Sequence, residues 1–340
     1  MTDKKVLIIG LGSMGKRRIR NLQALGFSHV NGFDLREDRR KEAFEKYKIK
    51  TFSNFDEAIA SYKYDAFIIS LPPDLHHIYM KKALELSIPF FVEASVLDTD
   101  YDEIIKTAYQ KKIVVAPSLT LFFHPAIKKI FEVIKSGELG AISTFNYHSG
   151  QYLPDWHTYE KVSDFYVSKK STGGAREIVP FELCWITKLF GFPKNVSGMV
   201  KKTIHIEGAP EIDDTYSALF DYEKFTVNVT IDVVSRYATR KLLINGEKKQ
   251  LRWEWDKNCI EIFDPIKKEW EILKYEMLGA AAGYNANITE QMYIDEMKNF
   301  FEAIDGKTPF PSNLDFDHRV LKLLYEIENS SSKKTFVQFS

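Results

Sequence analysis

Three glycines near the start of the chain have the spacing of a dinucleotide-binding turn. Gly10, Gly12 and Gly15 follow the apolar run Val6–Ile9 in the pattern G-x-G-x-x-G, with Ser13 and Met14 between them. In this pattern the first glycine allows a tight turn and the second lets a pyrophosphate approach the backbone. The third lets the following helix pack closely on the strand. The helix N-terminus then supplies N–H groups and a positive dipole end for the phosphates.

An acidic residue lies where such a site needs one. A second predicted strand, residues 29–33, ends in Asp34, about 20 residues beyond the glycines. A carboxylate at this point can accept both ribose hydroxyls of the adenosine and repels a 2′-phosphate, which favours NAD over NADP. Two alternatives stay open: Arg36 and Arg39 could still bind a 2′-phosphate, and Asp34 could instead cap the next helix.

Further candidates follow the next strands of the same half. The apolar runs 65–70 and 89–93 each read as a buried strand. Ligands sit at the carboxyl ends of parallel strands, so the residues there are expected to line the nicotinamide half of the site. His76, in the first turn of a helix, either bonds near the cofactor or is structural. The remaining cofactor-binding candidates are Ser70, Leu71, Pro72, Pro73, Glu93 and Ala94.

The second half carries a segment dense in aromatic side chains with polar ends. It begins near Tyr152 and Trp156 and continues to Tyr166 and Lys169. Tyrosine and tryptophan stack on sugar faces while their polar ends hydrogen-bond hydroxyl groups. The alternative is an aromatic loop that packs onto a sheet. Arg176 and Arg236 are further substrate-binding candidates. Arg236 and Arg240 could bind a phosphate or carboxylate, or form surface salt bridges.

The order of elements predicts two domains. Strands and helices of about three turns alternate through the first part, which is the pattern of a doubly wound parallel sheet. Strand-like runs then dominate, with Asn245-Gly246 as the type I′ turn of a hairpin. The expected fold is an α/β Rossmann domain, residues 1–121, followed by an α+β domain with a large, mostly antiparallel open sheet, residues 122–340. Helices are expected at 125–135, 175–190 and 289–304.

These motifs together resemble the Gfo/Idh/MocA family of oxidoreductases. The likeness includes Gly10–Gly15, Asp34 and the Pro72-Pro73-x-x-His76 turn. It extends over Phe91-Val92-Glu93, Phe123-His124-Pro125 and Gly173-Gly174-Ala175 to nearly the whole chain. The resemblance implies NAD as cofactor and a substrate bound between the second sheet and the nicotinamide. It also implies a homodimer or homotetramer formed through the open face of that sheet.

The chain departs from the family at the positions that carry catalysis there. The family usually has Glu-Lys-Pro where this chain has Glu93-Ala94-Ser95, so the lysine that bonds the reacting hydroxyl is missing. Family members often carry Asp and His on the helix after the glycine pair, where this chain has Ile178 and Glu182. Pro180 is expected to kink that helix or delay its start. The candidate catalytic groups are therefore Glu182, as a base or as a carboxylate paired with a nearby cation, His157 and Lys169.

Composition narrows the class of protein. The 47 basic and 47 acidic residues cancel, which argues against binding nucleic acid. The run Lys16-Arg17-Arg18 is expected on the solvent side of its helix. Cys184 and Cys259 form no disulfide framework, no metal is expected, and no membrane segment or signal is apparent, so the protein should be cytoplasmic.

The sequence therefore predicts an NAD-dependent oxidoreductase that moves a hydride to or from a carbohydrate, including phosphorylated or nucleotide-linked sugars. Two alternatives remain at this point. One is an NAD(H)-binding sensor or partner subunit without turnover, because the usual lysine and histidine are absent. The other is a lyase or glycosidase with tightly held NAD.

Overall fold

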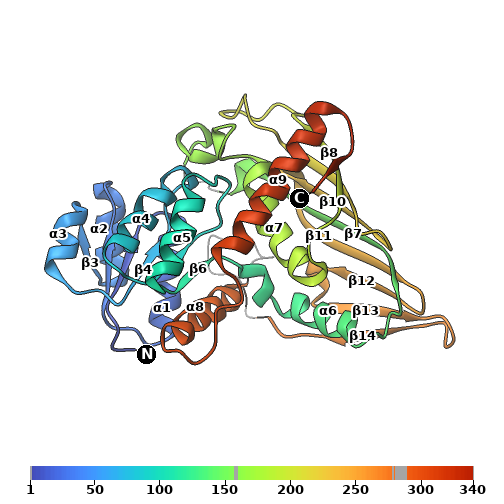
Figure 1. The fold of residues 1–340 in the computed structure, drawn as a ribbon, viewed down its shortest axis with the longest axis horizontal. Helices are drawn as coiled ribbons and strands as arrows, with labels where there is room; N and C mark the ends of the chain where they lie inside the picture. Colours follow the sequence, from blue (N-terminus) through green and yellow to red (C-terminus); the bar gives the residue numbers. More distant parts are fainter. Residues whose placement is uncertain (1, 157–159, 278, 280–288, 340) are drawn as a thin grey trace. The chain divides into compact units, whose positions relative to one another are not determined.

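The structure is a computed structural model that describes residues 2–156, 160–277, 279 and 289–339. It consists of two compact units (Figure 1). The first contains Met1–Thr120 and Met292–Arg319, and the second contains Leu121–Gln291 and Val320–Ser340. The first unit therefore takes in a late stretch of chain that the predicted boundary at residue 121 assigns to the second domain.

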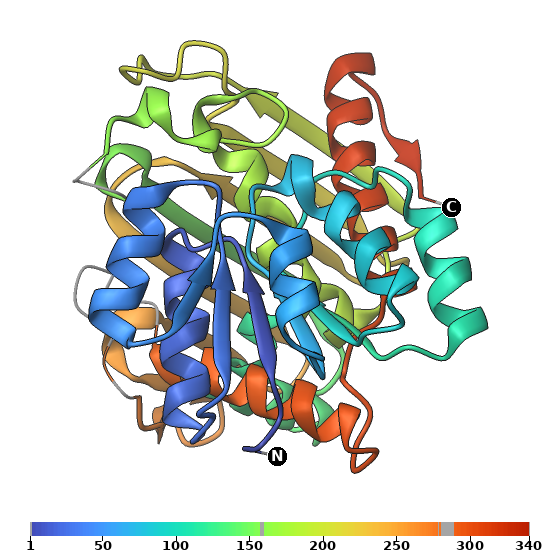
Figure 2. The ribbon, with the colours of Figure 1, turned by 90° about the vertical axis from the view of Figure 1, so that its left-hand side faces the viewer.

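A six-stranded parallel sheet in the order β3-β2-β1-β4-β5-β6 forms the centre of the first unit (Figures 1 and 2). Helices follow the strands in alternation, as the sequence predicts for a doubly wound sheet. The strands are β1 (Val6–Ile9), β2 (Val30–Phe33), β3 (Lys50–Phe52), β4 (Ala66–Ile69), β5 (Phe90–Val92) and β6 (Val115–Pro117). The helices are α1 (Ser13–Ala24), α2 (Glu37–Tyr47), α3 (Phe55–Ser61), α4 (His76–Glu85), α5 (Tyr101–Lys111) and α8 (Glu290–Ile304).

Side-chain alternation explains how this sheet is covered. Successive strand residues point to opposite faces, so Val6 and Ile8 share one face of β1. Those side chains and their neighbours on β4 and β5 pack in one buried cluster with residues of α1, α2 and α8. The rings of Phe27 and Phe301 lie 4.4 Å apart in this cluster. Helix α8 is therefore part of the core of the first unit, although it follows in sequence only after the second sheet.

A nine-stranded, mostly antiparallel sheet forms the second unit, in the order β14-β13-β12-β11-β7-β10-β9-β8-β15. Among the described strands of this second sheet, β7 and β10 are the only pair that runs parallel. The long strands are β7 (Ile142–Tyr152), β8 (Asn195–Lys201), β9 (Thr215–Asp221), β10 (Thr226–Asp232) and β11 (Val234–Gly246). The others are β12 (Gln250–Glu254), β13 (Cys259–Asp264), β14 (Glu269–Lys274) and β15 (Val337–Gln338).

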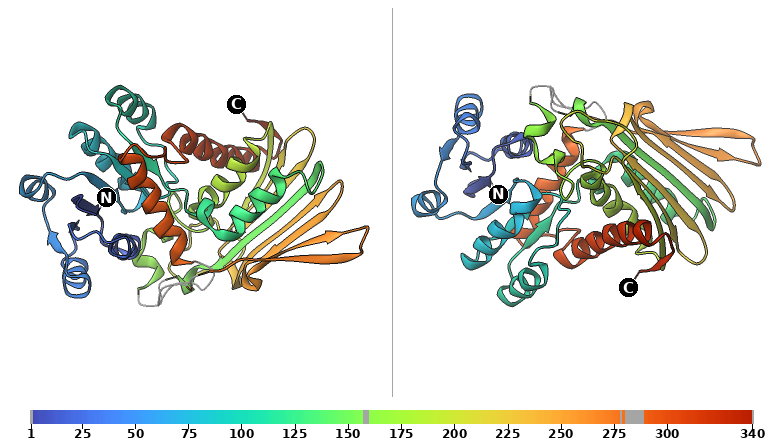
Figure 3. Two further views of the ribbon diagram at one scale, coloured as in Figure 1. Left: turned by 90° about the horizontal axis from the view of Figure 1, so that it is seen from below. Right: turned by 90° about the horizontal axis from the view of Figure 1, so that it is seen from above.

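Helices cover one face of the second sheet: α6 (Pro125–Lys135), α7 (Ala175–Phe190) and α9 (Leu314–Lys333), which begins in the first unit (Figure 3). Within the described part of the chain no helix covers the other face, so the predicted open sheet is confirmed. Helix α7 begins at Ala175, upstream of Pro180, so the expectation that this proline delays the helix start is wrong.

The predicted type I′ turn at Asn245-Gly246 is also wrong. Both residues belong to β11, and Asn245 pairs with Gln250 across the hairpin. The connection is Glu247-Lys248, closed by a 3.0 Å hydrogen bond from Gly246 N to Lys249 O, and neither residue has the positive φ that a type I′ turn requires. Gly246 serves close packing instead, because a Cβ there would lie 2.2 Å from the carbonyl oxygen of Leu139.

None of the helices that the structure describes is long and apolar enough to cross a membrane.

Candidate dinucleotide and substrate sites

The glycine turn after β1 has the shape that a dinucleotide needs. Gly10 has φ +94°, and a Cβ on it would lie 2.6 Å from the carbonyl oxygen of Ser70. A Cβ on Gly15 would lie 1.9 Å from the carbonyl oxygen of Gly10, so α1 can approach the strand only with glycine there. A Cβ on Gly12, in contrast, would meet only the side chain of Arg39, at 3.4 Å. The outer side of Gly12 is thus open to a ligand and close to a cation.

Helix α1 presents its N-terminus at this turn. The helix begins at Ser13, and its N-cap is Gly12, which has no side chain to bond the first N–H groups. No acidic residue lies in the first turn, where Ser13 and Met14 are partly exposed. The N–H groups and the positive end of the helix dipole therefore suit a phosphate.

Asp34 occupies the end of β2, as the sequence predicts, and is tied to the glycine turn. Its Oδ2 accepts a 2.7 Å hydrogen bond from Leu11 N, and its Oδ1 accepts one of 2.8 Å from Arg36 N. Each carboxylate oxygen has a second lone pair for a further donor. The Arg36 side chain turns to Asp38, at 2.6 Å and 3.1 Å, whereas Arg39 lies 3.9 Å from Asp34. Of the two arginines, Arg39 is the one placed at the turn.

His76 holds the loop after β4. Its Nε2 donates to the carbonyl oxygen of Leu71 at 2.8 Å, and burial lowers its pKa to about 4, so the ring is neutral at pH 7. The other ring nitrogen, Nδ1, is buried and has no partner among the described residues. The bond to Leu71 fits the structural alternative for His76. Of the other predicted residues of these loops, Leu71, Pro72 and Ala94 are partly exposed, and Pro73 is buried.

Two arginines of α1 are buried, contrary to the prediction for the basic run. Arg18 is 0% exposed and donates to both carboxylate oxygens of Glu93, at 2.7 Å and 2.8 Å. It also lies 2.9 Å from Glu296 of α8. Arg17 is 2% exposed and covers the ring of Tyr293 at 4.2 Å. The solvent-facing interpretation is wrong for both residues, because acidic and aromatic partners from distant parts of the sequence meet this side of α1.

In the second unit the carboxylate of Glu182 is buried and is surrounded by hydrogen-bond donors of the same unit. It is 0% exposed and accepts hydrogen bonds from Tyr147 Oη at 2.6 Å and Ser149 Oγ at 2.8 Å. Arg240, itself 2% exposed, donates from Nε at 3.0 Å and from Nη2 at 2.9 Å. Glu182 is therefore the paired helix carboxylate that the sequence allows as an alternative, and Arg240 forms a buried ion pair rather than one on the surface.

Glu177, which was not among the residues expected from the sequence, is a buried carboxyl group of this unit. It lies in the first turn of α7, directly after the glycine pair, and its Oε1 accepts a hydrogen bond from Tyr166 Oη. Its Oε2 is buried and has no partner among the described residues. Burial raises the pKa of Glu177 to about 7, and the bond from Tyr166 opposes that only in part. The one feature of the sequence that could have indicated Glu177 is its place next to Ile178, where family members often carry an aspartate.

The other predicted substrate residues fall into separate groups. The guanidinium of Arg236 lies 3.7 Å from the ring centre of Tyr152, and buried Trp156 Nε1 has no partner in the described chain. Arg176 is held by Glu328, at 2.6 Å and 3.3 Å, and by the carbonyl oxygen of Ser171. Lys169 has an exposed side chain. His157 lies outside the described residues.

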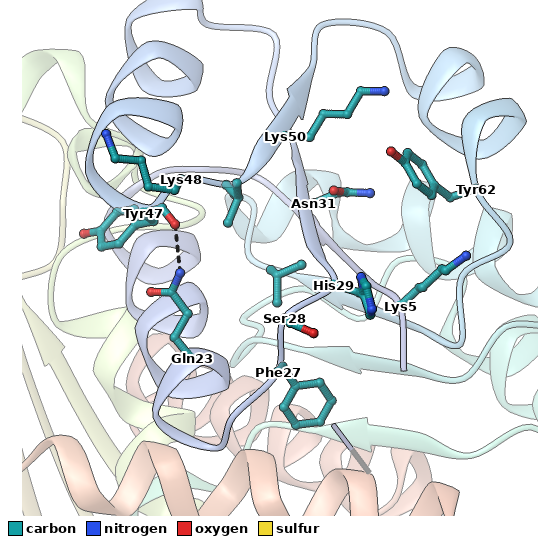
Figure 4. Close-up of a pocket in the computed structure, with 12 residues that line it drawn as sticks. Lys5, Gln23, Phe27, Ser28, His29, Asn31, Tyr47, Lys48, Lys50 and Tyr62 are labelled. Atoms are coloured by element: carbon teal, nitrogen blue, oxygen red, sulfur yellow. Dashed lines mark hydrogen bonds between the residues drawn. The ribbon is translucent and has the colours of Figure 1, made fainter. Parts of the chain in front are cut away.

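A pocket of about 360 Å³ lies in the first unit at the amino ends of the parallel strands, whereas the glycine turn lies at their carboxyl ends (Figure 4). It is lined by residues at the amino ends of the strands, including Lys5, His29 and Lys50, and by Lys48 just after α2. Helices α1 and α2 end at this edge, and cations complement the negative ends of helix dipoles. Because dinucleotides bind at the carboxyl ends of parallel strands, this pocket is not the cofactor site.

Comparison with known proteins decides the family. A family model described as "Oxidoreductase family, NAD-binding Rossmann fold" matches residues 4–117, and the GFO/IDH/MocA C-terminal domain matches residues 127–252. The chain belongs to the Gfo/Idh/MocA family. Membership confirms the predicted Rossmann domain followed by a mostly antiparallel sheet, and the prediction of an NAD-dependent oxidoreductase.

Solved structures share this Gfo/Idh/MocA fold at low sequence identity. A levoglucosan dehydrogenase in complex with NADH is 15% identical, with a TM-score of 0.85 and 99% of each chain covered. The myo-inositol 2-dehydrogenase from Lactobacillus plantarum is 16% identical, with a TM-score of 0.83, and 99% of this chain and 100% of that chain are covered. An oxidoreductase from Agrobacterium radiobacter in complex with NAD+, L-tartaric acid and magnesium is 13% identical, with a TM-score of 0.85. No curated protein sequence matches the chain.

Proposed function

We propose that this protein uses NAD(H) to move a hydride to or from a carbinol carbon of a carbohydrate. The observation that carries the proposal is the open glycine turn with Asp34 bonded across it to Leu11 N. Family membership supports the redox class. The names of the levoglucosan and myo-inositol dehydrogenases among the structural relatives support a polyhydroxylated substrate.

The residues around the turn fit the cofactor. Gly12, Ser13, Met14 and the N-terminus of α1 would hold the pyrophosphate, with Arg39 beside them. Asp34 would accept the adenosine ribose hydroxyls and exclude a 2′-phosphate. The loops that follow β4 and β5 would hold the nicotinamide half, with Glu93 and Ala94 at the second of them. When bound, the nicotinamide supplies a carbon that accepts or gives the hydride.

Glu177 is the group proposed to handle the substrate proton. Oxidation of a carbinol needs a base for the hydroxyl proton, and a base works best when its pKa is near the working pH. Glu177 meets this condition, and one of its carboxylate oxygens has no donor among the residues that the structure describes. Buried polar atoms without a partner are rare, and a substrate hydroxyl would satisfy this one. Glu182, whose contacts are all made within the fold, would instead fix α7 against the sheet.

The finer substrate class proposed is a sugar that carries a phosphate group. Tyr152 and Trp156 are flat surfaces with polar ends, suited to sugar rings. Arg236 lies on the ring of Tyr152 and forms no ion pair with a carboxylate of the described residues, so its guanidinium can bind a phosphate.

The direct test is turnover of NAD+ with a panel of neutral, phosphorylated and nucleotide-linked sugars. We expect NADH to form with at least one substrate, faster with a phosphorylated sugar than with its neutral counterpart. Products are analysed as well, because a rearranged or cleaved sugar without net NADH would identify a lyase or glycosidase that retains its NAD. Failure of folded protein to bind either NAD+ or NADH at millimolar concentration would refute the whole proposal.

Removing the charge of Asp34 should weaken the choice of NAD over NADP. Asp34→Asn keeps a side chain of the same size but no longer repels a 2′-phosphate, and Arg39 remains next to it. The ratio of kcat/KM for NAD+ to that for NADP+ should fall about tenfold or more, since one unit charge beside the phosphate is removed. Asp56→Asn, on the surface of the same unit, is the control and should leave the ratio unchanged. An unchanged ratio in Asp34→Asn would place the selectivity elsewhere.

The open face of the second sheet is proposed as the site of self-association into a homodimer or homotetramer. Exposed apolar side chains lie on edge-side strands of that sheet, namely Met199 on β8 and Ile272 on β14, which are 59% and 56% exposed. Light scattering of the purified protein should give the mass of two or four chains. Ile272→Lys should shift that mass toward the monomer, and a monomeric wild-type protein would contradict the proposal.

A further inference from the structure

The 166–174 loop, which leads into α7, folds back on itself. Thr172 is 0% exposed, and its Oγ1 donates to the carbonyl oxygen of Tyr166 at 2.9 Å. A Cβ on Gly173 would lie 1.8 Å from a carbonyl oxygen across the loop, so this close approach requires glycine. The shape of the loop places Tyr166 Oη where it donates to the carboxyl group of Glu177.

Arg176, in the first turn of α7, connects this loop to helix α9. Its Nη1 donates to the carbonyl oxygen of Ser171, within the loop, at 2.6 Å. Its Nε and Nη2 donate to the two carboxylate oxygens of Glu328 on α9, at 2.6 Å and 3.3 Å. The guanidinium is a rigid planar fork, so contacts on both of its sides fix its orientation. Arg176 therefore holds the loop in a set position relative to α9.

Glu328 is in turn held by the second sheet. Tyr216 on β9 is 2% exposed, and its Oη donates to Glu328 Oε1 at 2.9 Å. The ring of Tyr325, one turn earlier on α9, lies 5.6 Å from the guanidinium of Arg176. All of these residues belong to the second unit. A strand and a helix of that unit thus support the arginine that holds the loop.

We propose that Glu328 is a positioning residue for Glu177: through Arg176 it fixes the 166–174 loop, which keeps Tyr166 hydrogen-bonded to the Glu177 carboxyl group. The bond from Tyr166 lowers the pKa of Glu177, which burial raises, so the position of the loop sets the pH at which this group titrates. The catalytic part of the inference rests on the proposed function, because it needs Glu177 as the base. It adds that a carboxylate of α9 tunes that base without touching the substrate.

An NMR titration of the folded protein with isotope-labelled glutamate side chains tests the inference without turnover. Glu177→Gln identifies the signal of Glu177. Tyr166→Phe removes the hydrogen bond directly, and it should move the titration midpoint of that signal up by about one pH unit, because a bond to a charged group is lost. Glu328→Gln removes the charge that holds Arg176, and it should move the midpoint in the same direction by about half as much.

Three further variants separate positioning from a general disturbance. The double variant Tyr166→Phe, Glu328→Gln should have the midpoint of Tyr166→Phe alone, because no hydrogen bond is left to weaken. Arg176→Lys keeps the charge but not the planar fork, so it should shift the midpoint as Glu328→Gln does. Glu326→Gln is the control: it makes the same change on α9 at a carboxylate bonded to Asn329 of that helix, and it should leave the midpoint unchanged.

A midpoint that stays at its wild-type value in Tyr166→Phe, or in both Glu328→Gln and Arg176→Lys, would overturn the inference. A shift in Glu328→Gln that persists in the Tyr166→Phe background would do so too, since Glu328 would then act by another route. The pH profile of kcat/KM separates this inference from the proposed function, and its midpoint should follow the NMR midpoint in each variant. A profile that stays fixed while the NMR midpoint moves would refute Glu177 as the base but not the positioning of its carboxyl group.

Discussion

Replacing Glu177 by glutamine should lower kcat about 10²- to 10⁴-fold, the usual contribution of a general acid or base. The substitution keeps the size of the side chain and a hydrogen-bonding oxygen for Tyr166, so the fold should persist. It removes the carboxyl group of Glu177. Among the described residues of the second unit, this is the one carboxyl group whose pKa burial raises to near neutrality. Steady-state kinetics on the substrate found in the panel measure the effect.

The dependence of the rate on pH provides a second readout of the same residue. Burial raises the pKa of Glu177 to about 7, so the carboxylate form predominates above pH 7 and the acid form below it. Carbinol oxidation needs the carboxylate, and kcat/KM should therefore fall as the pH drops through about 7. The reverse reaction needs the acid, and its rate should fall as the pH rises through the same value. Glu177→Gln should flatten both profiles in this range.

Two control variants test whether the loss of activity is specific to the carboxyl group of Glu177. Glu269→Gln alters an exposed carboxylate on β14 and should leave kcat and its pH profile as in wild type. Glu177→Asp keeps the acid on a shorter side chain and should retain part of the rate. Full activity in Glu177→Gln would remove Glu177 from the mechanism and return attention to Glu182, His157 and Lys169.

Replacing Arg240 by methionine should lower the free energy of unfolding by about 3–5 kcal/mol, because it leaves the buried carboxylate of Glu182 without its cation. Glu182 is 0% exposed and cannot reach water unless the packing opens. Tyr147 and Ser149 still donate to the carboxylate, which keeps the loss from being larger. Denaturant unfolding, followed by tryptophan fluorescence of the second unit, measures the change.

The double variant Glu182→Met, Arg240→Met is the informative control for that prediction. Replacing both members of a buried ion pair by apolar groups is often neutral or stabilising, so the double variant should recover most of the stability that Arg240→Met loses. Glu182→Gln should keep kcat within about tenfold of wild type, below the usual contribution of a general base. A loss of activity as large as that expected for Glu177→Gln would show that Glu182 takes part in the chemistry.

The first unit could be predicted in detail because its signals are local. Strands buried on both faces read as continuous apolar runs, and Val6–Ile9 and Ala66–Ile69 have this form. Helix limits were equally visible: Gly26, just past α1, has the positive φ of a helix-ending glycine. The positions of Gly10 and Asp34 follow from that pattern of elements.

Features that depend on distant partners could not be predicted. Arg17 and Arg18 look like a solvated helix face until Glu93, Tyr293 and Glu296 are known to meet them. The use of Gly246 as a packing residue depends on Leu139, more than a hundred residues earlier in the chain. The environment of Glu177 likewise depends on Tyr166 and on burial, which the local sequence does not reveal.

The return of α8 to the first unit has a consequence for biosynthesis. A ribosome that has made the six parallel strands must still add roughly 170 residues before α8 can cover the apolar face around Phe27 and Phe91. At typical elongation rates this takes about 10–30 s, during which the nascent sheet is open and Arg18 lacks one of its two carboxylates. An emerging chain of this kind is a natural client for chaperones, and its first 120 residues expressed alone should aggregate rather than bind nucleotide.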